Sequence, residues 1–153
     1  MTTQHKNGNI LNCEEGIIVH QVNTLGVFGA GLAKQIKNKY PEVFPSYELL
    51  CSKHRYCKQK LMGCVDIEPT KDGKYVASIF GQMYVGRDKR YTDYDALRLG
   101  LEKVESNAKV FNKSVAIPHG LGSGLAGGDW EIVYQMIVDV FGGSNVKATI
   151  YKI

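Results

Sequence analysis

Short runs of consecutive apolar residues, rich in β-branched side chains, recur along the chain and alternate with segments of helical periodicity. Such runs are typical of strands that are buried on both faces of a sheet. They predict strands at 16–23, 62–69, 74–82, 114–119 and 147–153. The Asp72-Gly73 pair between the second and the third of these segments is a strong signal for a hairpin turn.

Apolar residues at every third or fourth position predict the helices that lie between these strands. Leu32, Ile36 and Tyr40 have this spacing in the first half of the chain. Pro41 is expected to stop or kink the helix, because proline lacks the N–H that a helix interior requires. A second helix is expected to follow within 41–54.

Two further helices are predicted in the second half of the chain. Apolar residues recur at helical spacing between Leu97 and Phe111, and Thr92 and Asp95 before them have the spacing of a capping box. Asp129 precedes the last periodic segment and is expected to cap its helix.

The alternation of strands and helices indicates an α/β protein with helices on both faces of a largely parallel sheet, and the hairpin makes that sheet mixed. The 153 residues suit a single domain. No apolar run approaches the roughly 18–20 residues of a membrane span, and the polar start MTTQHKNGN lacks the apolar region of a secretory signal. We therefore expect a cytoplasmic protein with no membrane partner.

The formal net charge of +4 is mild, and its basic residues form only short groups along the chain. A dedicated nucleic-acid-binding protein is expected to have a denser basic stripe, so the charge favours a small anionic ligand over a nucleic acid. The four cysteines have neither the CxxC spacing of zinc sites nor the density of a disulfide scaffold. This predicts reduced thiols, no metal and no cofactor.

Two segments share one construction, in which a glycine-rich loop connects a buried strand to the start of a helix. The loops are 24–31 (TLGVFGAG) and 120–128 (GLGSGLAGG). Glycine lets backbone N–H groups approach a phosphate, and the helix start adds a partial positive charge. Neither loop contains GxGxxG or the GK[ST] of a Walker motif, which disfavours magnesium-dependent ATP hydrolysis. The alternative is that the glycines only permit tight turns.

These segments, together with NGNIL, FGQ, TDYDAL, IPHGLGSGLAGGDW and ATIYKI, resemble the macro domain family in order and spacing. More narrowly, they are similar to the branch that contains ADP-ribose-1''-phosphate phosphatases and terminal ADP-ribose glycohydrolases. The resemblance implies a single macro domain over 1–153. It also implies a three-layer α/β/α sandwich around a mixed, mostly parallel sheet, with ADP-ribose as the ligand.

The resemblance also implies where the ligand lies. Asn9 and Ile10 match the segment that meets the adenine, and Asn23 matches the asparagine that meets the distal ribose. The phosphates would be bound by the two glycine loops, at Gly29, Ala30, Gly31, Leu32, Gly120, Leu121, Gly122, Ser123, Gly124, Leu125 and Ala126. An aromatic side chain covers the ribose or the adenine in the family, and Phe28, Tyr84 and Tyr151 are the candidates here.

Two positions depart from the terminal glycohydrolases, where a lysine and an aspartate perform the reaction. This chain has Gln82 and Ala126 at the matching positions, and neither side chain can form a Schiff base or act as a base. The larger hydrolase branch has an aspartate in the first glycine loop, and this chain has none there. Neither mechanism is therefore expected.

The remaining candidates for a catalytic role are His20, Asn23, Gln82 and Asp129. His20 matches a histidine of the phosphatase members and can orient or deprotonate a water, or it can be a satisfied histidine at the sheet end. Its side chain should diverge from that of Asn23 unless the strand bends. His119 is interpreted as a strand-end hydrogen bonder and Asp129 as a cap first.

The family therefore implies an ADP-ribose-binding macro domain that hydrolyses a small derivative such as ADP-ribose-1''-phosphate. One alternative is a binding module without chemistry for ADP-ribose or its protein-linked form. Another is a de-ADP-ribosylating hydrolase with a mechanism that uses no lysine. ADP-ribosylated macromolecules are conceivable partners. The sequence leaves the linkage, the physiological ligand and the oligomeric state open.

Overall fold

The computed structural model describes residues 3–153. Its strands are β1 (Thr3–Asn7), β2 (Ile17–Val22), β3 (Val65–Pro69), β4 (Tyr75–Phe80), β5 (Val115–Pro118) and β6 (Ala148–Lys152). Its α-helices are α1 (Gly31–Lys39), α2 (Phe44–Lys53), α3 (Tyr94–Phe111) and α4 (Trp130–Phe141). Three short 3-10 helices complete the described elements: η1 (Ile10–Asn12), η2 (Pro41–Val43) and η3 (Lys58–Leu61).

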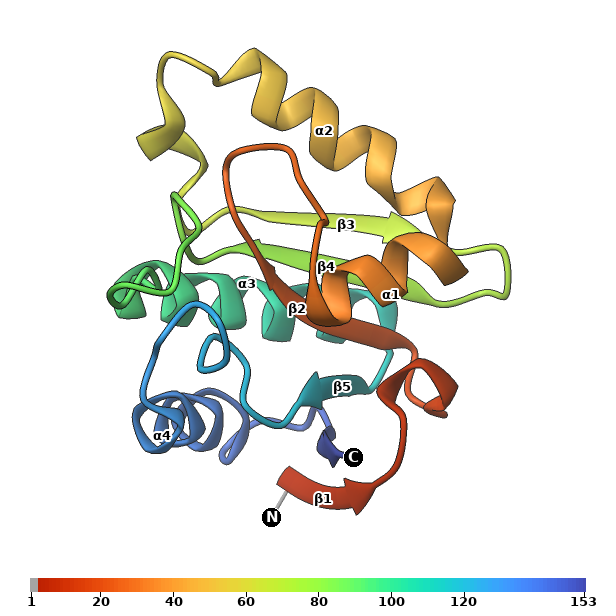
Figure 1. The fold of residues 1–153 in the computed structure, drawn as a ribbon. Helices are drawn as coiled ribbons and strands as arrows, with labels where there is room; N and C mark the ends of the chain where they lie inside the picture. Colours follow the sequence, from red (N-terminus) through yellow and green to blue (C-terminus); the bar gives the residue numbers. More distant parts are fainter. Residues whose placement is uncertain (1–2) are drawn as a thin grey trace.

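The described strands form one six-stranded sheet in the order β1-β6-β5-β2-β4-β3 (Figure 1). Neighbouring strands are parallel, apart from β3 and β4, which pair antiparallel through the predicted hairpin. Gly73 in its turn has a φ of 85°, a conformation that glycine adopts without strain. The mixed, mostly parallel sheet predicted from the sequence is confirmed.

Alternate residues of the central strand β2 enter two different hydrophobic cores. Ile17 and Val19 pack in the core that contains residues of α3 and α4. Ile18 and Val22 pack in the core that contains residues of α1 and α2. Because successive side chains of a strand point to opposite faces, the sheet is covered by helices on both sides. The three-layer α/β/α arrangement is therefore confirmed.

The N-terminal strand β1 was not predicted. It pairs in parallel with β6 at the edge of the sheet, and only Thr3 of its five residues is buried. The strand was missed because the segment TQHKN lacks the alternation of apolar and polar residues that identifies a half-buried strand in a sequence.

The predicted capping box of α3 is wrong. The N-cap of α3 is Asp93, whose side chain accepts a hydrogen bond from the N–H of Ala96. Thr92 instead donates its hydroxyl to the carbonyl oxygen of Gly122, 2.6 Å away. The capping-box pattern favoured Thr92 because an acidic residue, Asp95, lies three positions after it. An aspartate can cap a helix without such a partner, and Asp93 does so here.

The other predicted helix boundaries are confirmed. Helix α1 ends at Lys39, and Pro41 opens the separate turn η2. Asp129 caps α4 by accepting a hydrogen bond from the N–H of Glu131 at 2.9 Å. Within residues 3–153, no helix is both long enough and apolar enough to cross a membrane.

Candidate functional site

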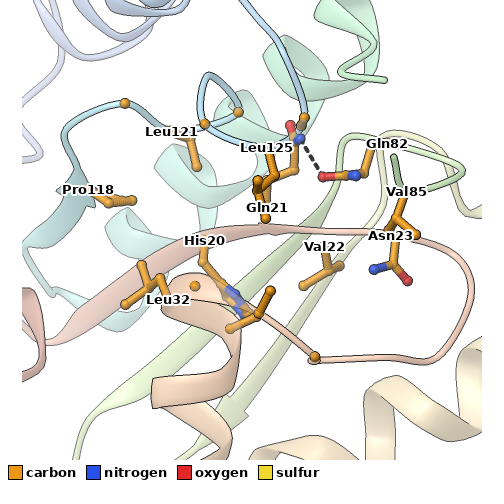
Figure 2. A pocket seen from close by; sticks show the side chains of 18 of the residues that line it. His20, Gln21, Val22, Asn23, Leu32, Gln82, Val85, Pro118, Leu121 and Leu125 are labelled. Atoms are coloured by element: carbon orange, nitrogen blue, oxygen red, sulfur yellow. Dashed lines mark hydrogen bonds between the residues drawn. The ribbon is translucent and has the colours of Figure 1, made fainter. Parts of the chain in front are cut away.

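A cavity of about 600 Å³ lies beyond the C-terminal ends of β2 and β5. This is the edge of an open α/β sheet where ligands bind. Its walls come from the end of β2, the two glycine-rich loops and the segment after β4 (Figure 2). The sequence-predicted residues that line it are His20, Asn23, Gly29, Ala30, Gly31, Leu32, Gln82, Gly120, Leu121, Gly122, Gly124, Leu125 and Ala126.

Four predicted residues are not among the described residues that line this cavity: Asn9, Ile10, Ser123 and Asp129. The Asn9 side chain accepts a hydrogen bond from the N–H of Leu11 and so caps η1, while Ile10 is buried in the core on the α1 side. The Ser123 N–H bonds to the carbonyl oxygen of Gly120 within the loop.

The start of α1 faces the cavity without a side-chain cap. Ala30 is the N-cap residue, has extended backbone angles, and can offer no side-chain acceptor. The first helical acceptor is its own carbonyl oxygen, which bonds to the N–H of Lys34. The N–H groups of Gly31, Leu32 and Ala33 have no acceptor within the helix, and all three residues line the cavity. These N–H groups and the helix dipole make this position attractive to an anion.

The second glycine loop is held by hydrogen bonds of its own. The N–H of Gly127 bonds to the oxygen of Gly124, and the N–H of Gly128 bonds to the oxygen of Gly122. Gly122 has a φ of 70°, and a Cβ on Gly128 would lie 2.5 Å from the Gly122 oxygen. Side chains at these two positions are therefore excluded by the local backbone.

His20 lies behind the first glycine loop and is only 2% exposed. Its Nε2 is 2.7 Å from the hydroxyl of Ser78, and its ring meets Phe28 edge-on at 5.1 Å. Burial lowers the pKa of His20 to about 3, so the imidazole is neutral at pH 7. A base this weak is poorly matched to deprotonating water at that pH. These contacts indicate that His20 supports the segment around Phe28 and does not transfer a proton.

Asn23 turns to the same side of β2 as His20, because the strand ends at Val22 and the alternation stops there (Figure 2). Its Oδ1 accepts hydrogen bonds from the N–H of Leu25 and the hydroxyl of Tyr47. Its Nδ2 donates to the oxygen of Val27 at 3.1 Å. An amide nitrogen has two N–H groups, so the second of them is available to a ligand in the cavity.

Gln82 is held in a network that the sequence reading missed. The Nε2 of Gln21 donates to the Oε1 of Gln82 at 2.9 Å (Figure 2). The same Nε2 donates to the hydroxyl of Thr92, also at 2.9 Å. Gln82 donates its own Nε2 to the oxygen of Tyr84, and Thr92 donates to the oxygen of Gly122. Backbone oxygens only accept hydrogen bonds, so both ends of the network fix the orientation of the Gln21 amide.

Gln21 therefore connects β2 to the segment after β4 and to the second glycine loop. A Cβ at Gly81 would lie 2.3 Å from its Oε1, so glycine is needed there to admit the side chain. One feature of the sequence could have indicated this role of Gln21. It is a polar residue on the face of β2 that otherwise carries Ile17 and Val19. In this arrangement Gln82 helps to position Gln21, and the Oε1 of Gln82 is already occupied by the hydrogen bond from Gln21.

The aromatic candidates fall into different surroundings. Phe28 and Tyr151 are buried, and the Tyr151 hydroxyl donates to the Glu15 carboxylate at 2.5 Å. Tyr84 is 51% exposed. Among the described lining residues the aromatic rings are the imidazoles of His20 and His119, and the His119 centroid is 4.6 Å from that of Trp130. Across residues 3–153, no three His, Cys, Asp or Glu side chains gather in a way that could hold a metal ion.

The chain is similar to proteins that act on ADP-ribosyl groups. It is 32% identical over 145 residues to a DNA ADP-ribosyl glycohydrolase of Mycobacterium tuberculosis. That match covers 94% of this chain and 40% of the relative, so the chain spans about two fifths of the relative's length. No protein-family model matches the chain.

Solved structures extend the comparison to the fold. The macrodomain of Mycobacterium tuberculosis DarG superposes with a TM-score of 0.83 at 29% identity, covering 99% of this chain and 97% of that one. Thermosipho africanus DarTG, solved in complex with ADP-ribose, gives a TM-score of 0.79 at 22% identity, covering 98% of this chain and 42% of that one. The sheet order, the two glycine loops and these similarities agree, and the chain belongs to the macro domain family.

Proposed function

We propose that the cavity binds ADP-ribose, with the diphosphate between the start of α1 and the second glycine loop. The observation that carries this proposal is the uncapped start of α1. Ala30 offers no side-chain acceptor, and the N–H groups of the first helical turn belong to residues that line the cavity. A phosphate supplies both the acceptors and the negative charge that this helix start lacks.

The distal ribose is assigned to the end of the cavity near Asn23. The second N–H of its Nδ2 is the donor available to a ribose hydroxyl there. The adenine is assigned to the opposite end, near His119 and next to Asn9 and Ile10 at the start of η1. The side-chain Oδ1 of Asn9 already accepts a hydrogen bond from the N–H of Leu11 but has a second lone pair for the adenine amino group.

Hydrolysis of an ADP-ribose derivative is the second candidate function. It is favoured by the name of the mycobacterial relative, a DNA ADP-ribosyl glycohydrolase. The sequence resemblance, which matches His20 to a histidine of the phosphatase members, also favours it. Among the described lining residues there is no carboxylate, so a carboxylate base is not supported. With a pKa of about 3, His20 suits a role in orienting a group through a hydrogen bond.

Calorimetric titration with ADP-ribose, with AMP and NAD alongside, tests the binding proposal. Micromolar ADP-ribose binding with much weaker AMP binding is expected, because AMP has one phosphate and no distal ribose. Gly29→Val is the matched cavity variant, since a Cβ there meets nothing within 4 Å and the helix start needs no glycine at this position. It should weaken binding at least about tenfold without loss of folding.

Gly143→Ala is the control, because its Cβ also meets nothing within 4 Å and the residue lies outside the cavity lining. Equal affinities of all three proteins would contradict the proposal. Turnover is tested separately, by phosphate release from ADP-ribose-1''-phosphate and by removal of ADP-ribose from a modified DNA strand. His20→Gln is the comparison variant. Turnover of either substrate by the wild type that exceeds the turnover by this variant supports hydrolysis.

A further inference from the structure

Helix α2 carries a tyrosine whose hydroxyl reaches the first glycine loop from outside the cavity lining. Tyr47 is fully buried and is not among the described residues that line the cavity. Its hydroxyl lies 2.8 Å from both the backbone oxygen and the side-chain Oδ1 of Asn23 and donates its proton to them. Figure 1 shows the loop after β2 rising from the sheet toward α2. Tyr47 therefore joins α2 to the residue that is assigned to the distal ribose.

The amide of Asn23 has one orientation that satisfies its neighbours. The N–H of Leu25 can only donate, and it meets Oδ1 at 2.9 Å. The oxygen of Val27 can only accept, and it meets Nδ2 at 3.1 Å. Exchange of the two amide atoms would set donor against donor and acceptor against acceptor. With Leu25 and Tyr47 on the two lone pairs of Oδ1, the group left for a ligand is the second N–H of Nδ2.

The contacts of Asn23 with Leu25 and Val27 lie within the loop and would move with it. Tyr47 is 24 residues away on a different element. Its ring centroid is 4.5 Å from that of Phe28 and 5.6 Å from that of Phe80, the last residue of β4. The loop contacts thus set the orientation of the amide, and Tyr47 sets its position relative to the sheet and α2.

The hydroxyl of Tyr47 is not needed to fill space in the core. A phenylalanine would provide the same ring, and a buried hydroxyl costs free energy unless it is hydrogen-bonded. Here the hydroxyl is bonded to Asn23. Burial raises the pKa of Tyr47, so the hydroxyl keeps its proton and is a donor at pH 7. The contact with Asn23 is therefore a permanent feature of the folded protein.

We propose that Tyr47 is a positioning residue that holds Asn23 where the free N–H of its Nδ2 meets the distal ribose. This inference rests on the proposed ADP-ribose site and adds a residue that acts on it through Asn23. Loss of the hydroxyl should weaken recognition of the distal ribose. Binding of the diphosphate should be preserved, because the ring that packs against Phe28 is kept.

Calorimetric titration of the Tyr47→Phe variant with two ligands tests this proposal. ADP has the adenosine and the diphosphate of ADP-ribose but lacks the distal ribose. The wild type should bind ADP-ribose at least about tenfold more tightly than ADP. Tyr47→Phe should weaken ADP-ribose binding about fivefold, as expected when one orienting hydrogen bond is lost, and ADP binding by less than about twofold.

Tyr40→Phe is the matched control. Tyr40 is also fully buried, and its hydroxyl donates to the Asp72 carboxylate at 2.6 Å, with neither residue among those that line the cavity. The control loses the same oxygen atom and one hydrogen bond, and both ligands should bind it within about twofold of the wild type. Urea denaturation of the two variants checks that each is folded under the conditions of the titration.

Asn23→Ala removes the side chain through which Tyr47 is proposed to act. In the Asn23→Ala background, Tyr47→Phe should lower ADP-ribose affinity by less than about twofold further. A full fivefold loss in that background would show that Tyr47 does not act through the Asn23 side chain and would overturn the proposal.

The side-chain amide signal of Asn23 in ¹⁵N NMR spectra gives a readout that a loss of stability alone would not move. Saturating ADP-ribose should shift this signal in the wild type and in Tyr40→Phe, and should shift it less in Tyr47→Phe. An equal shift in all three proteins would overturn the proposal.

The two ligands separate this inference from the proposed function. Equal losses of ADP and ADP-ribose affinity in Tyr47→Phe would overturn the inference, because the variant would then have changed the whole site. A preference for ADP-ribose that persists unchanged in Tyr47→Phe would defeat the inference alone. A wild type that binds ADP-ribose no more tightly than ADP would instead defeat the assignment of the distal ribose in the proposed function, and the inference would fall with it.

Discussion

Helices α1 and α4 begin in the same way in the sequence and differently in the structure. Each follows a buried strand and a glycine-rich loop. The start of α1 has no side-chain cap and faces the cavity. The start of α4 is capped by the Asp129 carboxylate, and Asp129 lies outside the cavity lining. The start of α1 is thus open to an anion, while the start of α4 already has the Asp129 carboxylate as its anion.

This difference assigns separate tasks to the two loops. At the first loop, the helix itself presents N–H groups and a dipole to the ligand. At the second loop, the backbone folds into consecutive turns. Thr92, which precedes α3, donates a hydrogen bond to the Gly122 oxygen and accepts one from Gln21. Similar glycine patterns therefore contribute to one site by different means, and the capping residue distinguishes them.

Converting the α1 start into a copy of the α4 start should have the largest effect. Ala30→Asp places a carboxylate where a phosphate is expected, and like charges about 4–5 Å apart repel by several kcal/mol at intermediate dielectric. ADP-ribose affinity should fall by about a hundredfold or more, as measured by calorimetry. The same change should stabilise the unliganded protein by about 0.5–1 kcal/mol, as measured by urea denaturation, because it caps α1.

Ala30→Asn is the matched control for this change, since it caps the helix without the charge. It should stabilise the protein similarly and weaken binding much less. Wild-type affinity in the Ala30→Asp variant would show that no phosphate lies at the start of α1.

Releasing the second loop should have an intermediate effect. Thr92→Val removes the hydroxyl that joins Gln21 to the Gly122 oxygen and leaves both half-buried groups without this partner. The free energy of unfolding should fall by about 1–3 kcal/mol. ADP-ribose affinity should fall several-fold, because the loop is no longer fixed at Gly122. A loss of stability with unchanged affinity would show that the network has no part in binding.

Opening the α4 start should have the smallest effect on binding. Asp129→Ala removes the cap and should cost about 1 kcal/mol of stability. ADP-ribose affinity should change less than twofold, because Asp129 is not among the described lining residues. A large loss of affinity or of turnover in a stable variant would return Asp129 to the candidates for a direct role in the site.

The sequence predicted the elements with clear periodicity. The strands β2 and β5, the long helix α3 and the two glycine loops all have strong local signals, and the parallel strands bring the two loops to one edge of the sheet. The Asp129 cap could be predicted because capping is a local interaction between a side chain and the next turn.

Features that depend on contacts distant in sequence were not predicted. Strand β1 is held by pairing with β6 rather than by an apolar face. The role of Gln21 depends on Gln82 and Thr92, which lie 61 and 71 residues away. His20 looked like a possible base, but its burial and low pKa arise from the packing of Phe28 and the neighbouring strand β4.

The most direct test of the central claim is a titration of ¹⁵N-labelled protein with ADP-ribose, followed through its amide NMR signals. The start of α1 should respond most, with large shifts at Gly31, Leu32 and Ala33, together with the second loop at Gly120–Ala126. The first turn of α4, from Trp130, should change little, because Asp129 already caps it. Large shifts at the start of α4 with none at the start of α1 would contradict the account.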